Sequence, residues 1–508
     1  MIEANVGDTI VVNMQNNLGN ESTSLHFHGM YQTGTQPYDG PVGVTQCPVN
    51  PGSSFTYTFK AYPAGTHWYH SHDKGQYPDG LRGKMIIHDP VWEKSLNVVE
   101  QIPLTMGDWY HTQMPELIEN QYLAADNTNG NIPSPNSFLF NETNKPLKFT
   151  FAAKKRYLLR MVSLSALTCS VFQVDGMTLT VVAVDGIPVE AYDTKTIFMC
   201  AGQSIDVVVV GPSNPLKSVQ YIAKMTTEML TGDIPPDSAI TIIGTVDFLV
   251  NGILTTLGNL LGAILSPFTV STIPTITLDD TALIPVDRQP LLTGVTKKVE
   301  FQTNQTFYPG IGTRIAVGNQ PFVEPKVPSL FTAFTTGQNA LNESTYGPGT
   351  VPQIYHANDV VQIYMTNPQP WPHPMHLHGH DFQVAGRGLG SWDGQDSSLD
   401  AIPVRRDTVV IPANGYLVLR FTADNPGVWY FHCHIDFHLI GGMAALFIET
   451  PEALQGMAVP AAALGICSTV GQASSGNCNG DQGALSAADA EQNCNTIFNT
   501  PRSHGATV

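Results

Sequence analysis

Short runs in which apolar and polar residues alternate occupy much of this chain. Residues 8–14 read DTIVVNM and residues 53–62 read SSFTYTFKAY, and a period of two is typical of strands with one buried face. Turn sequences such as NPGS, YPAG and PDG separate the runs. Continuous apolar runs such as SIDVVVVG at 204–211 indicate strands buried on both faces. The pattern therefore predicts a mainly β protein.

Three such strand-and-turn regions follow one another. The first ends near MIIHDP at 85–90, the second extends to PTITLDD at 274–280, and the third ends near Thr450. A length of 508 residues is enough for about three domains of ordinary size. We expect domains at 1–90, 91–280 and 281–450, followed by a small-residue tail at 451–508 that covers part of the surface.

One apolar segment does not follow the strand pattern. Residues 248–265 hold 18 positions without a charge, the lower limit for crossing a bilayer. The segment contains three Gly and two Asn, and a crossing would separate the first and third domains, which the shared metal site argued below excludes. We therefore expect a buried or partner-covered helical insertion, and no membrane partner.

Charge and cysteine content restrict the environment of the protein. The net charge of −18 repels phosphate backbones, so nucleic acid is not an expected partner. Glycosylation sequons at Asn20, Asn141, Asn304 and Asn342 indicate a secreted, extracellular glycoprotein. The chain opens on a strand pattern rather than a signal peptide. Of seven Cys, Cys433 lies among histidines, and the six others suit disulfide bonds in an oxidising compartment.

The histidines are strongly clustered. Twelve of the 16 lie within residues 26–72 and 373–438, in the strings HFHG, HWYHSH, HPMHLHGH and HCHIDFH. Residues i and i+2 of a strand face the same side, so each H-x-H pair offers two imidazoles to one metal site. The four pairs are His26/His28, His70/His72, His376/His378 and His432/His434.

The last cluster predicts two different metal sites that share one strand. His432 and His434 face one side, and Cys433 between them faces the other. A thiolate with two imidazoles and a weak axial thioether is the ligand set of a blue copper centre. Cys433, His373 and His438 supply the thiolate and imidazoles, and Met443 is placed for the axial position.

These clusters closely resemble those of the multicopper oxidase family, and the strings HFHGMYQTGTQPYDGP, GTHWYHSHDKGQYPDGLRG and HCHIDFHLIGGM resemble fungal laccases. The resemblance implies three consecutive cupredoxin-like Greek-key β-sandwich domains and four coppers per chain. The type 1 copper would lie in the third domain, and a cluster of one type 2 and two type 3 coppers between the first and third. It implies type 2 ligands His26 and His376, and type 3 ligands His28, His70, His72, His378, His432 and His434. His67 and His380 are expected outside the ligand set.

The resemblance also implies a reaction. A laccase-like oxidase couples four one-electron oxidations of phenolic or related aromatic donors to the reduction of dioxygen to water. Asp39 and Asp436 match acidic positions that supply protons to the cluster, and Cys47 matches a cysteine that bridges to the tail, at Cys467. Strands that normally precede the segment IEANVGD are missing, so we expect Met1 to be an artificial start.

Two departures from the laccase pattern leave other functions open. No Asp or Glu lies between Ser163 and Gln173, where laccases hold an acid that anchors phenols. The axial Met443 lowers the expected copper potential relative to Leu or Phe. The alternatives are a metallo-oxidase (ferroxidase) and an ascorbate-oxidase-like enzyme. A non-enzymatic blue copper electron carrier is a third, but it leaves eight histidines unexplained. The natural donor and the oligomeric state are not determined by the sequence.

Overall fold

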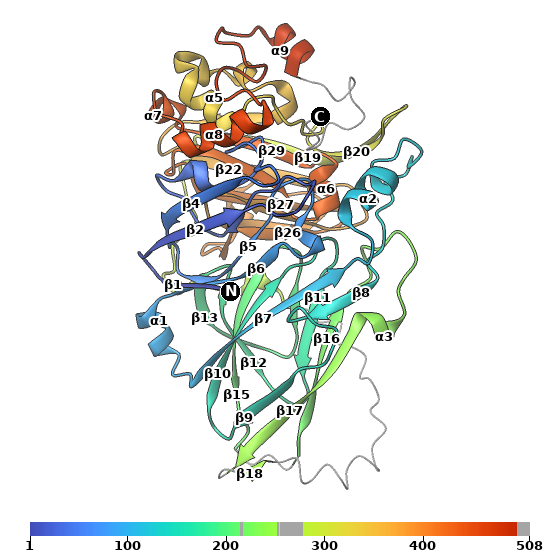
Figure 1. Ribbon diagram of the computed structural model, residues 1–508. Helices are drawn as coiled ribbons and strands as arrows, with labels where there is room; N and C mark the ends of the chain where they lie inside the picture. The colour runs from blue at the N-terminus through green and yellow to red at the C-terminus, as the bar shows by residue number, and fades with distance from the viewer. Residues whose placement is uncertain (214–216, 251–252, 255–277, 495–508) are drawn as a thin grey trace.

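The computed structural model describes residues 1–213, 217–250, 253–254 and 278–494, and its strands fall into three successive groups (Figure 1). The prediction of a mainly β protein is confirmed. In Figure 1 the first group, in blue, lies beside the third, in orange, and the second, in cyan and green, lies below them.

The first group forms a small two-layer domain. A four-stranded sheet with the order β1-β6-β5-β3 contains β1 (Ile2–Asn5), β3 (His26–His28), β5 (Gly65–His70) and β6 (Arg82–His88). A two-stranded sheet pairs β2 (Thr9–Gln15) with β4 (Ser54–Lys60). Alternation along β4 buries Phe55, Tyr57 and Phe59, and these rings pack on Phe27 and Met85 of the larger sheet. Burial of this apolar face holds the two layers together.

The second group forms two six-stranded sheets. The first has the order β13-β12-β15-β10-β7-β8, from β7 (Glu100–Trp109), β8 (Ser137–Phe140), β10 (Arg156–Ser163), β12 (Leu179–Val184), β13 (Ile187–Thr194) and β15 (Ser204–Val210). The second has the order β14-β11-β16-β17-β18, with β9 paired to β17. Its strands are β9 (Lys148–Ala152), β11 (Ser170–Val174), β14 (Ile197–Met199), β16 (Val219–Met225), β17 (Thr241–Val250) and β18 (Ile253–Leu254). Most of the segment expected as an apolar insertion, 248–265, lies outside the described residues.

The third group also forms two sheets. One has the order β20-β19-β22-β27-β24-β25, from β19 (Lys297–Tyr308), β20 (Gly312–Val317), β22 (Val360–Asn367), β24 (Phe382–Leu389), β25 (Arg405–Arg406) and β27 (Gly415–Thr422). The other has the order β21-β29-β28-β23-β26, from β21 (Pro352–Tyr355), β23 (His373–Leu377), β26 (Thr408–Ile411), β28 (Gly427–Cys433) and β29 (Ala444–Glu449).

Helices are short and lie mostly at the periphery. They are α1 (Pro90–Ser95), α2 (Met114–Leu117), α3 (Asp237–Ile240), α5 (Ser329–Thr335), α6 (Asp436–Ile440), α7 (Pro451–Leu454), α8 (Ala461–Val470) and α9 (Ala487–Cys494). Single helical turns occur at Gln36–Tyr38, Tyr77–Asp79, Ile118–Tyr122, Asp280–Ala282, Gly337–Leu341, Glu343–Thr345, Pro348–Thr350 and Asp396–Ser398. Within the described part of the chain, no helix has the length and apolar content needed to traverse a membrane.

Covalent and ionic links connect the groups. The predicted disulfide Cys47–Cys467 is confirmed and ties the tail to the first domain, and Cys169–Cys200 and Cys478–Cys494 pair the other four cysteines. Arg406, which is 1% exposed, binds Asp185 through two nitrogens at 2.8 and 2.9 Å and so joins the third group to the second. A buried, bidentate pair of this kind fixes orientation strongly.

Candidate metal centre

The eight histidines of the four H-x-H pairs meet between the first and third domains. His26 of β3 lies opposite His70 of β5, and His376 of β23 lies opposite His432 of β28. Seven of the eight imidazoles are at most 2% exposed, and His72 is partly buried. The structure therefore brings together the two distant segments that the histidine spacing singled out.

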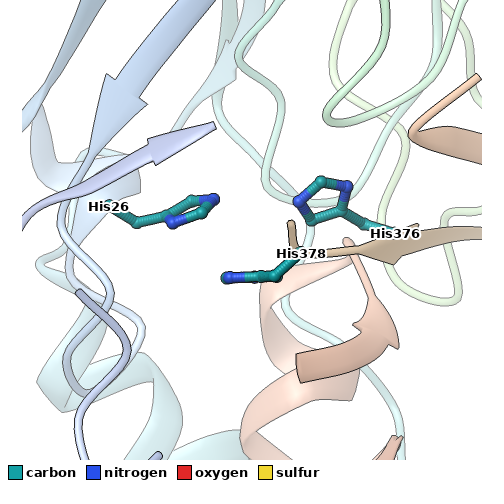
Figure 2. A group of neighbouring side chains, drawn as sticks. All are labelled: His26, His376 and His378. Atoms are coloured by element: carbon teal, nitrogen blue, oxygen red, sulfur yellow. The ribbon is translucent and has the colours of Figure 1, made fainter. Parts of the chain in front are cut away.

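Rings from the two segments stack on one another. The centroids of His28 and His376 are 3.8 Å apart, and those of His26 and His378 are 3.9 Å apart. Figure 2 shows His26 extending from one side toward His376 and His378 on the other. Apolar packing does not explain why eight imidazoles lie so close together, because each ring carries polar nitrogens that need partners.

The nitrogens of these rings fit metal ligation. His26, His70 and His376 each direct Nδ1 to a backbone carbonyl, while the buried Nε2 has no hydrogen-bond partner among the described residues. The carbonyl acceptors belong to Asp39, Ser71 and Asp407, at 2.7, 2.8 and 2.9 Å respectively. A ring that donates from Nδ1 carries its lone pair on Nε2, and this lone pair is the one that would bind a metal ion.

The protonation state of the cluster also suits a metal. Burial lowers the pKa of His70 and of His376 well below the usual range, and neighbouring imidazoles lower both further. The rings are therefore neutral at physiological pH, which is the form of imidazole that binds metal ions.

The donor atoms fall into overlapping groups of three. Atoms within 4.8 Å of one another are supplied by His26, His376 and His378, by His26, His28 and His70, and by His72, His378 and His432. Neither ring nitrogen of His434 has a hydrogen-bond partner within the described part of the chain, and its ring lies 5.1 Å from that of His28 and 5.5 Å from that of His70. The arrangement offers room for several ions rather than one.

A second centre contains the thiol. Nδ1 of His373 lies 3.1 Å from Nδ1 of His438, and Sγ of Cys433 lies 3.8 and 3.6 Å from these two atoms. Burial raises the pKa of the Cys433 thiol, so a cation is needed to hold it as a thiolate. Met443 is fully buried, and its backbone carbonyl accepts a 3.0 Å hydrogen bond from the Cys433 amide. These residues match the donor chemistry of a blue copper site.

The predicted acids lie beside the ligands. Oδ2 of Asp39 accepts a hydrogen bond from Nδ1 of His378 at 2.8 Å. Asp436 is 3% exposed, its Oδ2 has no hydrogen-bond partner in the described chain, and burial raises its pKa to about 8, helped by Asp79 and Asp108. Both carboxyls are therefore positioned to exchange protons near the cluster.

A cavity of about 60 Å³ opens onto the histidine cluster. Its wall includes His70, His72, His432, His434, Asp436 and Glu324. Because four clustered histidines face it, the cavity is a route by which a small molecule such as dioxygen could reach the metal site.

Two residues that hold clustered histidines in place were not predicted from the sequence. Oδ1 of Asp407 lies 3.2 Å from Nε2 of His28, and Oε1 of Gln369 accepts from Nε2 of His373 at 2.6 Å. Neither residue belongs to a spaced motif, so nothing in the sequence marks it. His67 and His380, expected outside the ligand set, are both buried, and His380 pairs with Glu449 at 3.0 Å.

Three family models, each described as multicopper oxidase, match residues 322–453, 1–91 and 100–243. The iron transport multicopper oxidase FET3 of Gibberella zeae is 37% identical over 489 residues, which cover 94% of this chain and 75% of that protein. The chain belongs to the multicopper oxidase family. It is a copper-dependent oxidoreductase that uses dioxygen, and the four-copper prediction is confirmed. The electron-carrier alternative is therefore set aside.

Solved structures of multicopper oxidases share the fold. The crystal structure of Fet3p, a multicopper oxidase that functions in iron import, aligns with a TM-score of 0.86 at 30% identity over 94% of this chain and 90% of that chain. The laccase from Botrytis aclada aligns with a TM-score of 0.77 at 28% identity over 92% of this chain and 85% of that one. The prediction of three cupredoxin domains is confirmed.

The prediction of a laccase-like oxidase for phenolic or related aromatic donors is wrong as the main function. The similarity to iron transport oxidases exceeds that to the laccase in both identity and TM-score. The motifs that suggested a laccase surround the copper ligands, which oxidases with different donors share. A shared fold and shared histidine clusters do not fix the donor, so the strings could not distinguish a laccase from an iron oxidase.

Proposed function

We propose that this multicopper oxidase is a metallo-oxidase that oxidises ferrous iron and passes the electrons to dioxygen. The observation that carries the proposal is the 37% identity to an iron transport oxidase over 94% of this chain. The pocket beside His438 argues only against a phenol donor, because its described wall, which includes Leu167, Met229 and Trp371, holds no carboxylate to anchor a phenol.

The ligand assignments belong to the same proposal. His373, Cys433 and His438 would hold the type 1 copper, with Met443 axial, and His26 and His376 would hold the type 2 copper. The type 3 pair would be held by His28, His70, His72, His378, His432 and His434. The unpartnered buried nitrogens and the 3.0 Å approach of Nε2 of His378 to Nε2 of His432 support this assignment. When bound, the coppers supply one-electron redox chemistry and the four electrons that dioxygen needs.

The protein itself contributes a path for the electrons and a source of protons. His432, Cys433 and His434 are consecutive, so a short covalent path joins the thiolate site to the histidine cluster. Asp39 orients His378 by accepting from its Nδ1, and the Asp436 carboxyl faces the cavity next to the cluster. We propose that both acids supply protons for the reduction of dioxygen to water.

We also propose that the protein is a secreted, extracellular glycoprotein. The sequon residues Asn20 and Asn342 are exposed, and Asn141 and Asn304 are only partly buried, which supports access for glycosylation. A shift in mass after enzymatic deglycosylation of protein isolated from culture medium tests this point.

Oxygen uptake by the copper-loaded enzyme separates the candidate donors. Rates are measured with ferrous ion, with a simple phenol and with ascorbate, each over a range of concentrations. We expect kcat/KM for ferrous ion to exceed that for either organic donor by at least about tenfold, which corresponds to about 1.4 kcal/mol of transition-state stabilisation. A larger kcat/KM for the phenol or for ascorbate contradicts the proposal. Cys433→Ser, which removes the thiolate, is the inactive control.

A further inference from the structure

Glu324 lies on the wall of the cavity that opens onto the histidine cluster, outside every motif described above. It belongs to the loop between β20 and α5, and backbone bonds fix its position. The Phe322 amide donates to the Gly442 carbonyl at 2.8 Å, and the Val323 amide donates to the Gly349 carbonyl at 2.7 Å. The carboxyl is therefore held at the cavity by the fold rather than by a flexible end of the chain.

The Glu324 side chain is seated on a glycine of the first domain. A Cβ on Gly43 would lie 2.2 Å from Cγ and 2.7 Å from Cδ of Glu324, so a side chain at position 43 would displace the carboxyl from its present place. The Gly43 carbonyl in turn accepts a 3.1 Å hydrogen bond from the Ser329 amide. Glu324 thus lies at the interface between the first and third domains, where the histidine cluster also lies.

The surroundings of Glu324 suit proton exchange. The Glu324 side chain is only partly buried, and it forms no hydrogen bond or ion pair with any other described residue. On the wall of the same cavity, Asp73 and Asp436 are each 3% exposed and each keeps one carboxylate oxygen without a partner among the residues described. A volume of about 60 Å³ is enough for a few water molecules. The cavity therefore connects a carboxyl near the solvent with unpartnered polar atoms next to the histidines.

We propose that Glu324 takes up protons from solvent and passes them into the cavity for the reduction of dioxygen. Each dioxygen consumes four electrons from the donor and four protons, and it yields two waters. Glu324 releases one proton into the cavity each time and is then reprotonated from solvent. Because it acts through the contents of the cavity and not by contact with dioxygen, it is a positioning residue. The inference rests on the proposed assignment of the histidines to the oxygen-reducing cluster, but not on iron as the donor.

The local electrostatics agree with this role. Burial, together with the nearby Asp73, raises the pKa of Glu324 to about 7, and Lys74 opposes the shift. A carboxyl with this pKa is half protonated near neutral pH, which favours both uptake and release. The other titratable groups on the cavity wall are His70, His72, Asp73, Lys74, Tyr77, Tyr430, His432, His434 and Asp436.

The test follows the reoxidation of pre-reduced, copper-loaded enzyme by dioxygen, observed through recovery of the blue absorption from pH 5 to pH 9. A chemical reductant supplies the electrons, so failure of ferrous ion as a donor would leave this measurement unaffected. In the native enzyme we expect the rate to fall as the pH rises through about 7, because the protonated carboxyl is lost. Glu324→Gln should be at least about tenfold slower at pH 6 and should lack this inflection.

Three further variants make the test specific. Glu324→Ala removes the carboxyl without requiring a new group to fit on Gly43, and it should reproduce the loss. Glu324→Asp should retain a pH inflection, since it retains a carboxyl. Glu300→Gln, at an exposed position of β19, removes the same charge and should behave as the native enzyme. A wild-type rate and pH profile in copper-replete Glu324→Gln or Glu324→Ala would overturn the inference, as would loss of the inflection in Glu324→Asp.

Discussion

Oδ2 of Asp39, from the first domain, lies 2.8 Å from Nδ1 of His378, from the third domain, and both side chains are fully buried. The backbone carbonyl of the same aspartate accepts from Nδ1 of His26 at 2.7 Å. One residue therefore orients two imidazoles from different domains, and its carboxyl lies within 3.3 Å of His26 and 2.8 Å of His378. A hydrogen bond to the ring nitrogen that faces away from a metal fixes the tautomer of the imidazole.

Asp39→Asn should slow oxygen reduction while leaving the blue absorption in place. The amide keeps the shape of the side chain but cannot deliver a proton, and within the described structure Asp39 forms no hydrogen bond with the proposed type 1 ligands. A loss of about 10²-fold in the reoxidation rate is the usual scale for a missing acid. The measurement is stopped-flow reoxidation of the reduced enzyme, with the exposed Asp233→Asn as the control. An unchanged rate with oxygen limiting would exclude a role for Asp39 in proton supply.

Asp436→Asn should have a similar effect for a different reason. Asp436 lines the cavity and keeps one oxygen that no described residue contacts by a hydrogen bond, so its carboxyl is available to exchange protons with the cavity contents. We expect reoxidation to slow by about 10-fold to 100-fold with the copper content unchanged. In the Asp39→Asn, Asp436→Asn double variant, the increase in activation free energy should be smaller than the sum of the two single increases if both acids serve the same proton-limited step. Strict additivity would indicate independent steps.

Met443→Leu should raise the reduction potential of the type 1 copper. A coordinating thioether stabilises the oxidised site less than a stronger ligand but more than an alkyl group, so its removal favours the reduced form. The measurement is a redox titration monitored at the blue absorption band. An identical potential in the variant would mean that the sulfur is not a ligand, and that Met443 serves only to fill the core.

Breaking the Cys47–Cys467 bridge should destabilise the junction between the tail and the first domain. The bond closes a loop with a sequence separation of 420, and removal of a native disulfide costs about 2–4 kcal/mol in typical cases. The double variant Cys47→Ala, Cys467→Ala should therefore unfold at a lower urea concentration than the native protein. The blue absorption should be unchanged before unfolding, since neither cysteine touches a predicted copper ligand. Equal unfolding midpoints would show that packing of α8 alone holds the tail.

Several features of the site were predictable because they are local. The prediction that each H-x-H pair lies on one strand is confirmed for His26 and His28 on β3. In the other three pairs the strand ends before the second histidine, as β28 ends at Cys433, so His434 lies just beyond it. Asp407 and Gln369 were not predictable, because each reaches its histidine through a contact that depends on how strands β23 and β26 and the preceding turn are placed. Glu324 was not predictable for the same reason, since it faces the cavity only when the first and third domains pack against each other.

The amino-acid sequence by itself determined which side chains can bind copper, how they are spaced, and that the chain is mainly β, because alternation and ligand chemistry are properties of short segments. The tertiary structure decided that His28 and His376 stack, that Asp39 reaches His378, and which loops enclose the cavity. These relationships join residues hundreds of positions apart, so they arise only from strand register and the packing of whole domains against each other.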